Sequence, residues 1–117
     1  MDLIEANLKG KEGTLIFSTH EKEQFVEKEF MELMNFIKTL NHNISKSERP
    51  NKSNQVWKLC LIIQRQLTYH YNPSDHGEID NLTDLGISSI SNIIEYVADC
   101  FATGKKMELA LSPITDW

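Results

Sequence analysis

The fold of this chain depends on residues 55–71, whose sequence is QVWKLCLIIQRQLTYHY. Apolar side chains alternate with mostly polar ones here, as in a strand, but another set recurs at three- and four-residue steps, as on a helix. The segment is rich in good helix formers and is longer than the about 5–6 residues of a common strand. We therefore expect a helix, with Ser53 or Asn54 as its N-cap and Pro73 just past its end. The alternating set is Trp57, Leu59, Leu61, Ile63, Leu67, Tyr69 and Tyr71, and the helical set is Val56, Cys60, Ile63, Leu67 and Tyr71.

A second helix is expected over residues 20–42, where the apolar side chains form one continuous stripe. Ser18 and Thr19 offer an N-cap for it. Glu21 and Glu23 would place negative charge in its first turn, where such charge is stabilised by the helix dipole. The stripe consists of Phe25, Val26, Phe30, Leu33, Met34, Ile37 and Leu40.

A third helix is expected over residues 88–103, with Asp84 or Ser88 as its N-cap and Gly104 as its C-terminal stop. Its apolar residues share one face, which leaves Glu95 and Asp99 on the outer face. The residues of the inner face are Ile90, Ile93, Ile94, Val97 and Phe101.

The remaining segments are shorter or more polar. Short strands are expected near residues 14–18 and 107–111, because both are runs of mainly apolar residues. Residues 1–8 suit either a strand or a short helix, and residues 43–54 form a polar linker. The sequence thus predicts a single compact domain over residues 1–117 with an α-dominated α+β fold.

The net negative charge comes entirely from the later part of the chain. Residues 1–59 hold nine basic and nine acidic side chains, whereas residues 60–117 hold three basic and eight acidic ones, for a net charge of -5. No lysine or arginine occurs from Gln66 to Gly104. Charges of one sign repel each other, so such a cluster is most useful when a cationic partner neutralises it. The acidic residues of that stretch are Asp75, Glu78, Asp80, Asp84, Glu95 and Asp99.

The sequence predicts a protein of the cytoplasm. The longest unbroken apolar run, from Leu59 to Ile63, is far shorter than the roughly 20 residues that cross a bilayer. The N-terminal residues lack the apolar centre of a secretory signal, so no membrane association is expected. Cys60 and Cys100 are expected to be buried thiols, with a disulfide between them as the alternative for an exported protein.

No catalytic or cofactor motif occurs in the sequence. The glycines are scattered, and the four histidines lack the spacing of a zinc site. His70 and His76 could close around a metal together with the acidic residues between and beside them, but a solvated acidic loop is the favoured interpretation. We therefore expect neither an enzyme nor a cofactor, metal or nucleic-acid site, since phosphate contacts require clustered basic residues. The small basic edge near the linker consists of Lys46, Arg49, Lys52 and Lys58.

Residues 82–90, LTDLGISSI, resemble the segment of acyl and peptidyl carrier proteins in which a serine receives phosphopantetheine. In those carriers an acidic residue, a leucine and a glycine precede the serine, which opens an acidic helix. The resemblance would make Ser89 the modified residue, although Ser88 replaces the usual aspartate and only 28 residues follow Ser89. The favoured interpretation is that Asp84 and the serines cap a helix.

In its size, its acidity and its lack of a catalytic motif, the chain resembles the immunity proteins of contact-dependent growth inhibition toxins and nuclease colicins. This resemblance implies an inhibitor whose carboxylates cover the active or substrate-binding surface of a basic nuclease toxin. A broader alternative is an acidic adaptor or regulator. The expected contact surface combines an acidic loop, the outer face of the third helix and aromatic anchors, namely Asp75, Glu78, Asp80, Asp84, Glu95, Asp99, Tyr69, Tyr71 and Trp117.

Overall fold

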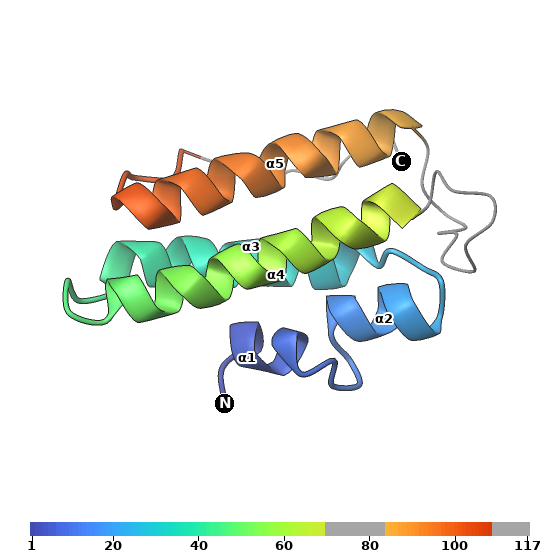
Figure 1. Ribbon diagram of the computed structural model, residues 1–117, viewed down its shortest axis with the longest axis horizontal. Helices are drawn as coiled ribbons and strands as arrows, with labels where there is room; N and C mark the ends of the chain where they lie inside the picture. Colours follow the sequence, from blue (N-terminus) through green and yellow to red (C-terminus); the bar gives the residue numbers. More distant parts are fainter. Residues whose placement is uncertain (70–83, 109–117) are drawn as a thin grey trace.

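The apolar stripes of the sequence form helices in the computed structural model, which describes residues 1–69 and 84–108. These residues contain five helices and no strand (Figure 1). The expected α+β class is therefore wrong for the described part of the chain, although the α-dominated character is confirmed. The helices are α1 (Leu3–Leu8), α2 (Leu15–Glu21), α3 (Glu27–Asn43), α4 (Arg49–Tyr69) and α5 (Asp84–Thr103).

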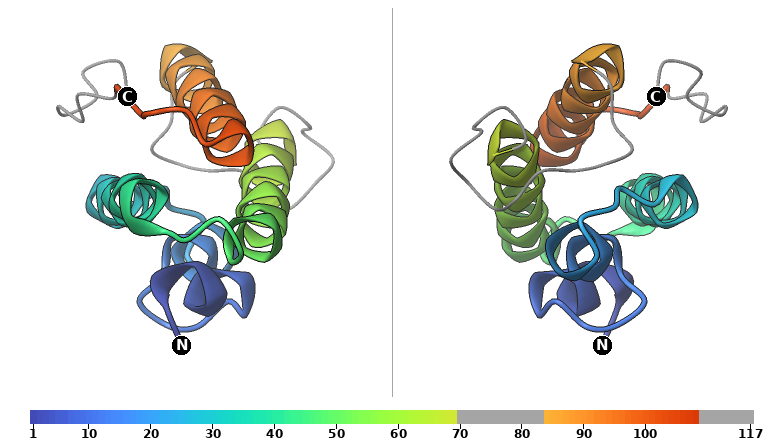
Figure 2. Two further views of the ribbon diagram at one scale, coloured as in Figure 1. Left: turned by 90° about the vertical axis from the view of Figure 1, so that its left-hand side faces the viewer. Right: turned by 90° about the vertical axis from the view of Figure 1, so that its right-hand side faces the viewer.

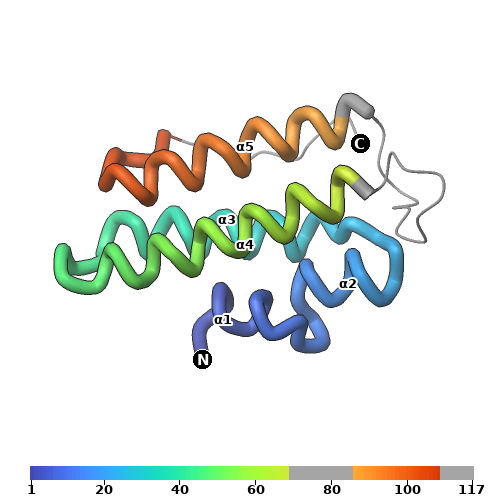
Figure 3. The backbone as a smooth tube through the Cα atoms, in the orientation of Figure 1, coloured from blue at the N-terminus to red at the C-terminus, as the bar shows by residue number. Residues whose placement is uncertain are grey.

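The helices are arranged like a four-helix bundle whose first helix is broken in two. Viewed from either end, α3 and α4 lie at opposite corners, with α5 on one side and the α1–α2 pair on the other (Figure 2). The α1–α2 pair packs against both α3 and α4, and α5 packs against the same two helices on its side. α1 and α2 follow each other along one side of the bundle (Figure 3), so together they take the place of a fourth long helix.

The core explains why residues 55–71 are helical. Of the helical set, Val56, Cys60, Ile63 and Leu67 are buried, as the sequence predicts, and they belong to one core cluster with buried residues of the other helices. Tyr71 lies outside the described residues. Leu59 is fully buried whereas Leu61 is 39% exposed, although an alternating strand would place both on one face. The largest fully buried side chains are Phe25, Phe30, Phe101, Ile4, Leu15, Leu33, Met34, Ile37, Leu59, Ile63 and Leu67.

Residues 14–18 begin α2, so the strand expected there is wrong. Thr14 is the N-cap, and its Oγ1 accepts a hydrogen bond from the Phe17 N–H at 3.3 Å. The buried Asn7 of α1 accepts from the Ile16 N–H with its Oδ1 at 3.2 Å and donates with its Nδ2 to the Leu3 carbonyl at 2.9 Å. These contacts satisfy amide groups that the first turn of a helix leaves unpaired, and they join α1 to α2.

Three other predicted segments differ from the structure. One is the helix expected over residues 88–103, which starts earlier, at Asp84. The helix expected over residues 20–42 starts at Glu27, and Ser18 and Thr19 lie buried inside α2 instead of capping it. Of the strand expected at 107–111, residues 107 and 108 are not in a strand, and 109–111 lie outside the described residues.

The polar segment 43–54 divides between a short connection and the first turns of α4. α3 ends at Asn43 and α4 starts at Arg49, with the Ser45 hydroxyl accepting a hydrogen bond from the Glu48 N–H at 3.3 Å. The earlier start shows that neither Ser53 nor Asn54 is the N-cap. Gly104 does follow the end of α5 and has a φ of 74°, which is the left-handed conformation expected of a glycine stop.

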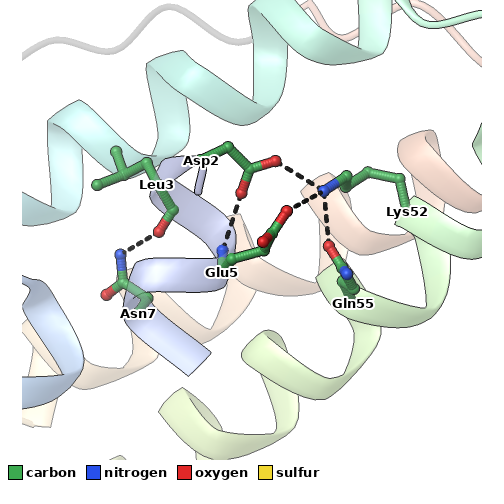
Figure 4. Close-up of polar contacts among 6 residues, drawn as sticks. All are labelled: Asp2, Leu3, Glu5, Asn7, Lys52 and Gln55. Atoms are coloured by element: carbon green, nitrogen blue, oxygen red, sulfur yellow. Dashed lines mark hydrogen bonds and ion pairs between the residues drawn. The ribbon is translucent and has the colours of Figure 1, made fainter. Parts of the chain in front are cut away.

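Lys52 of α4 joins this helix to the N-terminal end of α1 (Figure 4). Its Nζ donates to Asp2 Oδ2 at 2.6 Å, to Gln55 Oε1 at 2.7 Å and to Glu5 Oε1 at 3.4 Å. Partial burial alone would raise the pKa of Asp2, but the hydrogen bonds from Lys52 and from the Glu5 N–H outweigh it and hold this pKa below 3.8. Burial likewise disfavours the charged Lys52, but its carboxylate partners raise its pKa above 10.5.

Lys52→Met should lower the free energy of unfolding by about 1 kcal/mol at neutral pH, because the aliphatic stem stays while the ion pairs are lost. Since the pKa of Asp2 is lowered on folding, its contribution is present above its unfolded pKa and disappears as the pH falls through the folded one. Urea unfolding of variant and wild type should therefore differ at pH 7 and agree near pH 2. Lys58→Met, at an exposed position of α4, is the control. If the free energy of unfolding of Lys52→Met is still below that of the wild type near pH 2, the lost ion pairs are not the cause.

Candidate functional site

α4 carries a second apolar stripe that faces away from the core. Trp57 is 59% exposed and Leu61, one turn further along, is 39% exposed. Both are large apolar side chains that the fold leaves exposed to solvent. Contiguous exposed apolar residues of this kind are typical of an interaction surface, whereas scattered single ones are not.

A shallow groove between α4 and α5 adjoins these two residues. Its volume is about 190 Å³, and Ile94 and Ala98 of α5 form its apolar side. Glu95 is one of its lining residues, and Gln64 is held in place because its Oε1 accepts a hydrogen bond from the Ser91 hydroxyl at 3.1 Å. The groove is lined by Trp57, Cys60, Leu61, Gln64, Ile94, Glu95 and Ala98. We call this surface, together with the neighbouring Asp99, the Trp57 face.

The two edges of the Trp57 face have opposite charges. On the α5 side, Glu95 and Asp99 are exposed and lie one helical turn apart. On the α4 side, a second hollow of about 490 Å³ is lined by Leu61 and Ile62, by the cationic Lys58 and Arg65, and by Leu8 of α1. An apolar centre with charged edges is the usual construction of a protein–protein interface.

The structure supports the expected outer position of the two α5 carboxylates. Within residues 1–69 and 84–108, neither Glu95 nor Asp99 forms an ion pair with a cation of this chain. Asp84 is the first residue of α5 and Tyr69 is the last of α4, but their side chains are outside the described part. The other predicted contact residues, Asp75, Glu78, Asp80, Tyr71 and Trp117, are also outside it.

Ser89 occupies a different place from the modified serine of carrier proteins. α5 begins at Asp84, so Ser89 lies in its second turn and does not open the helix. Its side chain is half-buried, whereas Ser88 is exposed. This geometry does not present Ser89 at a helix start, where the carrier resemblance would require it.

The described residues contain no disulfide and no group of metal ligands. Cys60 and Cys100 are free, buried thiols, so the disulfide considered as the alternative is absent. Burial raises the pKa of Cys60 to about 12, which keeps its sulfur protonated and unreactive. No three His, Cys, Asp or Glu residues of this part are grouped as metal ligands, and His70 and His76 fall outside it. No helix in the same residues has the length and apolar character needed to cross a membrane.

Sequence reasoning missed Trp57 and Leu61 as surface residues. Once residues 55–71 are taken as a helix, both fall beside the buried stripe that contains Val56 and Cys60, not within it. The signal available in the sequence was a pair of apolar residues outside the stripe that this helix buries. Comparison of the chain with protein-family models, with curated proteins and with solved structures gives no match.

Proposed function

We propose that this chain is a binding protein and not an enzyme, and that it acts in the cytoplasm as an immunity-type inhibitor of a basic nuclease toxin. The observation that carries the proposal is the exposure of Trp57 beside the α5 carboxylates Glu95 and Asp99. Tryptophan is among the residues that most often dominate binding energy, and a solvated one is available to a partner. Carboxylates beside it favour a partner with a cationic surface.

The toxin would use the same surface to hold nucleic acid, because phosphate binding requires lysine and arginine. Glu95 and Asp99 would occupy places that phosphate groups take in the substrate complex. Asp75, Glu78, Asp80 and Asp84 would extend the negative surface toward the start of α5, and this part of the proposal comes from the sequence. An acidic surface of this size also speeds the encounter with a positively charged partner.

The proposal predicts a defect in association when Glu95→Gln and Asp99→Asn are combined. The association rate with the nuclease domain encoded beside this chain should fall about threefold to tenfold at low salt, because long-range attraction is reduced. The difference in association rate between the double variant and the wild type should become smaller as salt is added. Stopped-flow or surface-based kinetics would measure it. Glu12→Gln combined with Glu32→Gln is the matched control, because it removes the same charge from exposed positions on α3 and the α1–α2 loop.

Co-expression tests the biological role directly. The adjacent nuclease should stop growth when it is expressed alone and should not do so together with this chain. Substitution of Asp75, Glu78, Asp80 and Asp84 by their amides, added to the α5 pair, should abolish protection. If the variant with all six substitutions still protects fully, the acidic surface is not the surface that inhibits the toxin. Binding to a basic partner without nuclease activity would instead support an acidic adaptor.

A further inference from the structure

A third hollow lies where α3 ends, α4 begins and the chain leaves α5. These helix ends are at the left of Figure 1. The volume of the hollow is about 550 Å³, which is within the range of small-molecule sites. Unlike the groove of the Trp57 face, it is lined mainly by cationic and amide side chains. The lining residues are Asn35, Lys38, Thr39, Asn41, His42, Asn43, Arg49, Gly104, Lys106 and Met107. We call it the Arg49 cavity.

Arg49 is fixed in this cavity by neutral oxygen atoms. Its Nη1 donates to Asn41 Oδ1 at 2.6 Å and to the Phe101 carbonyl at 3.0 Å, and its Nη2 donates to the Asn41 carbonyl at 2.8 Å. The Phe101 ring also lies below the guanidinium, with its centroid 5.1 Å from Cζ. A guanidinium has five N–H donors, so the three bonds orient it without using all of them.

The positive charge of the cavity exceeds the negative charge near it. Within the described residues, Arg49 and Lys106 form no ion pair with a carboxylate. The C-terminal ends of α3 and α5 point here and contribute partial charges of about −0.5 each. Arg49 and Lys106 bring two full positive charges, so an excess remains for an anion.

Gly104 lies beside the Nε edge of Arg49. A Cβ at this position would lie 3.7 Å from Arg49 Nε, and the φ of 74° would strain any other residue. Across the cavity, Asn35, Lys38, Thr39 and His42 share one face of α3 because they are three or four residues apart. This face adds amide, hydroxyl and imidazole groups to the cations.

We propose that the Arg49 cavity binds a small phosphorylated molecule. A phosphate group suits the site because a pre-oriented guanidinium binds its oxygens with two parallel hydrogen bonds, and Lys106 supplies additional charge. Asn35 and Thr39 are placed to bind hydroxyl or base groups on the remainder of the ligand. The concave shape favours a free small molecule over a lipid headgroup or a nucleic-acid backbone.

Titration of the ¹⁵N-labelled full chain with AMP at constant ionic strength tests this site. Saturable shifts should be confined to residues 35–43, to the Arg49 Nε–H and to residues 104–107. Lys106→Gln should weaken AMP binding about threefold to fivefold, as expected for loss of one exposed charge. Lys11→Gln, which also removes an exposed charge, here from the α1–α2 loop, should leave it unchanged. Arg49→Lys, checked for folding by circular dichroism, should weaken it about tenfold or more.

Two comparison ligands separate the sources of phosphate. Vesicles of phosphatidylcholine with phosphatidic acid and a short single-stranded RNA should compete weakly or not at all with AMP. The proposal is overturned if AMP shifts are unsaturable or spread over all lysines, or if Lys106→Gln and Lys11→Gln behave alike. Preference for the vesicles or the RNA over AMP would also overturn it. These outcomes are independent of toxin binding, because the two sites lie in different grooves. The Trp57 face lies between α4 and α5, whereas the Arg49 cavity is lined by α3, the start of α4 and the residues after α5.

Discussion

Leu59→Ala should lower the free energy of unfolding by about 3 kcal/mol, whereas Leu61→Ala should lower it by about 1 kcal/mol or less. The two substitutions remove the same atoms from positions only two residues apart. Leu59 is fully buried in the core cluster, so its truncation leaves a cavity there. Leu61 is 39% exposed, and water can fill the space that its side chain leaves.

This pair of variants separates the two structures that residues 55–71 could form. In an alternating strand, Leu59 and Leu61 would share one face and their truncations would have similar costs. In α4 they differ because two residues correspond to a rotation of about 200° around the helix. Urea unfolding followed by circular dichroism would give both free energies. Equal losses for the two variants would contradict the packing of α4.

The sequence predicted the three long helices because each has an apolar stripe that is buried in the structure. The stripe of α3 includes Phe30, Leu33 and Ile37, all buried, and that of α5 includes Ile90 and Val97. The information is local in both cases, because the spacing of apolar residues alone defines the buried face. α4 was ambiguous because it is apolar on its outer side as well, a property related to its candidate function.

The sequence could not reveal that residues 14–18 are helical. Their apolar and β-branched composition favours a strand, but a strand requires a partner strand, and none is formed in the described residues. The hydrogen bond from the Ile16 N–H to Asn7 connects residues nine positions apart and depends on the turn between α1 and α2. Local preference was overridden by a contact that only the folded chain contains.

The candidate site was predicted in part. The outer position of Glu95 and Asp99 follows from the helical spacing of α5, and the structure supports it. The acidic loop before α5 lies outside the described residues, so its role stays a prediction. The apolar centre of the Trp57 face was not predicted, because it is formed by two helices whose relative placement depends on the whole core.

Trp57→Ala should weaken binding of the nuclease partner by at least about 30-fold, equivalent to about 2 kcal/mol, with little change in the stability of the free chain. The indole is 59% exposed before binding and would lose its contact with water in the complex. Because the core does not depend on it, its truncation should change the free energy of unfolding by less than about 1 kcal/mol. Calorimetric titration and urea unfolding would measure the two effects.

Kinetics distinguish this role of Trp57 from that of the carboxylates. Loss of an anchor acts mainly on the dissociation rate, whereas loss of Glu95 and Asp99 acts mainly on the association rate and depends on salt. The dissociation rate of Trp57→Phe should lie between those of the wild type and Trp57→Ala, since part of the aromatic area remains. Lys11→Ala, on the α1–α2 loop, should bind normally. A Trp57→Ala variant that is folded and binds within about twofold of wild type would show that the partner does not use this face, since hot-spot residues cost far more when truncated.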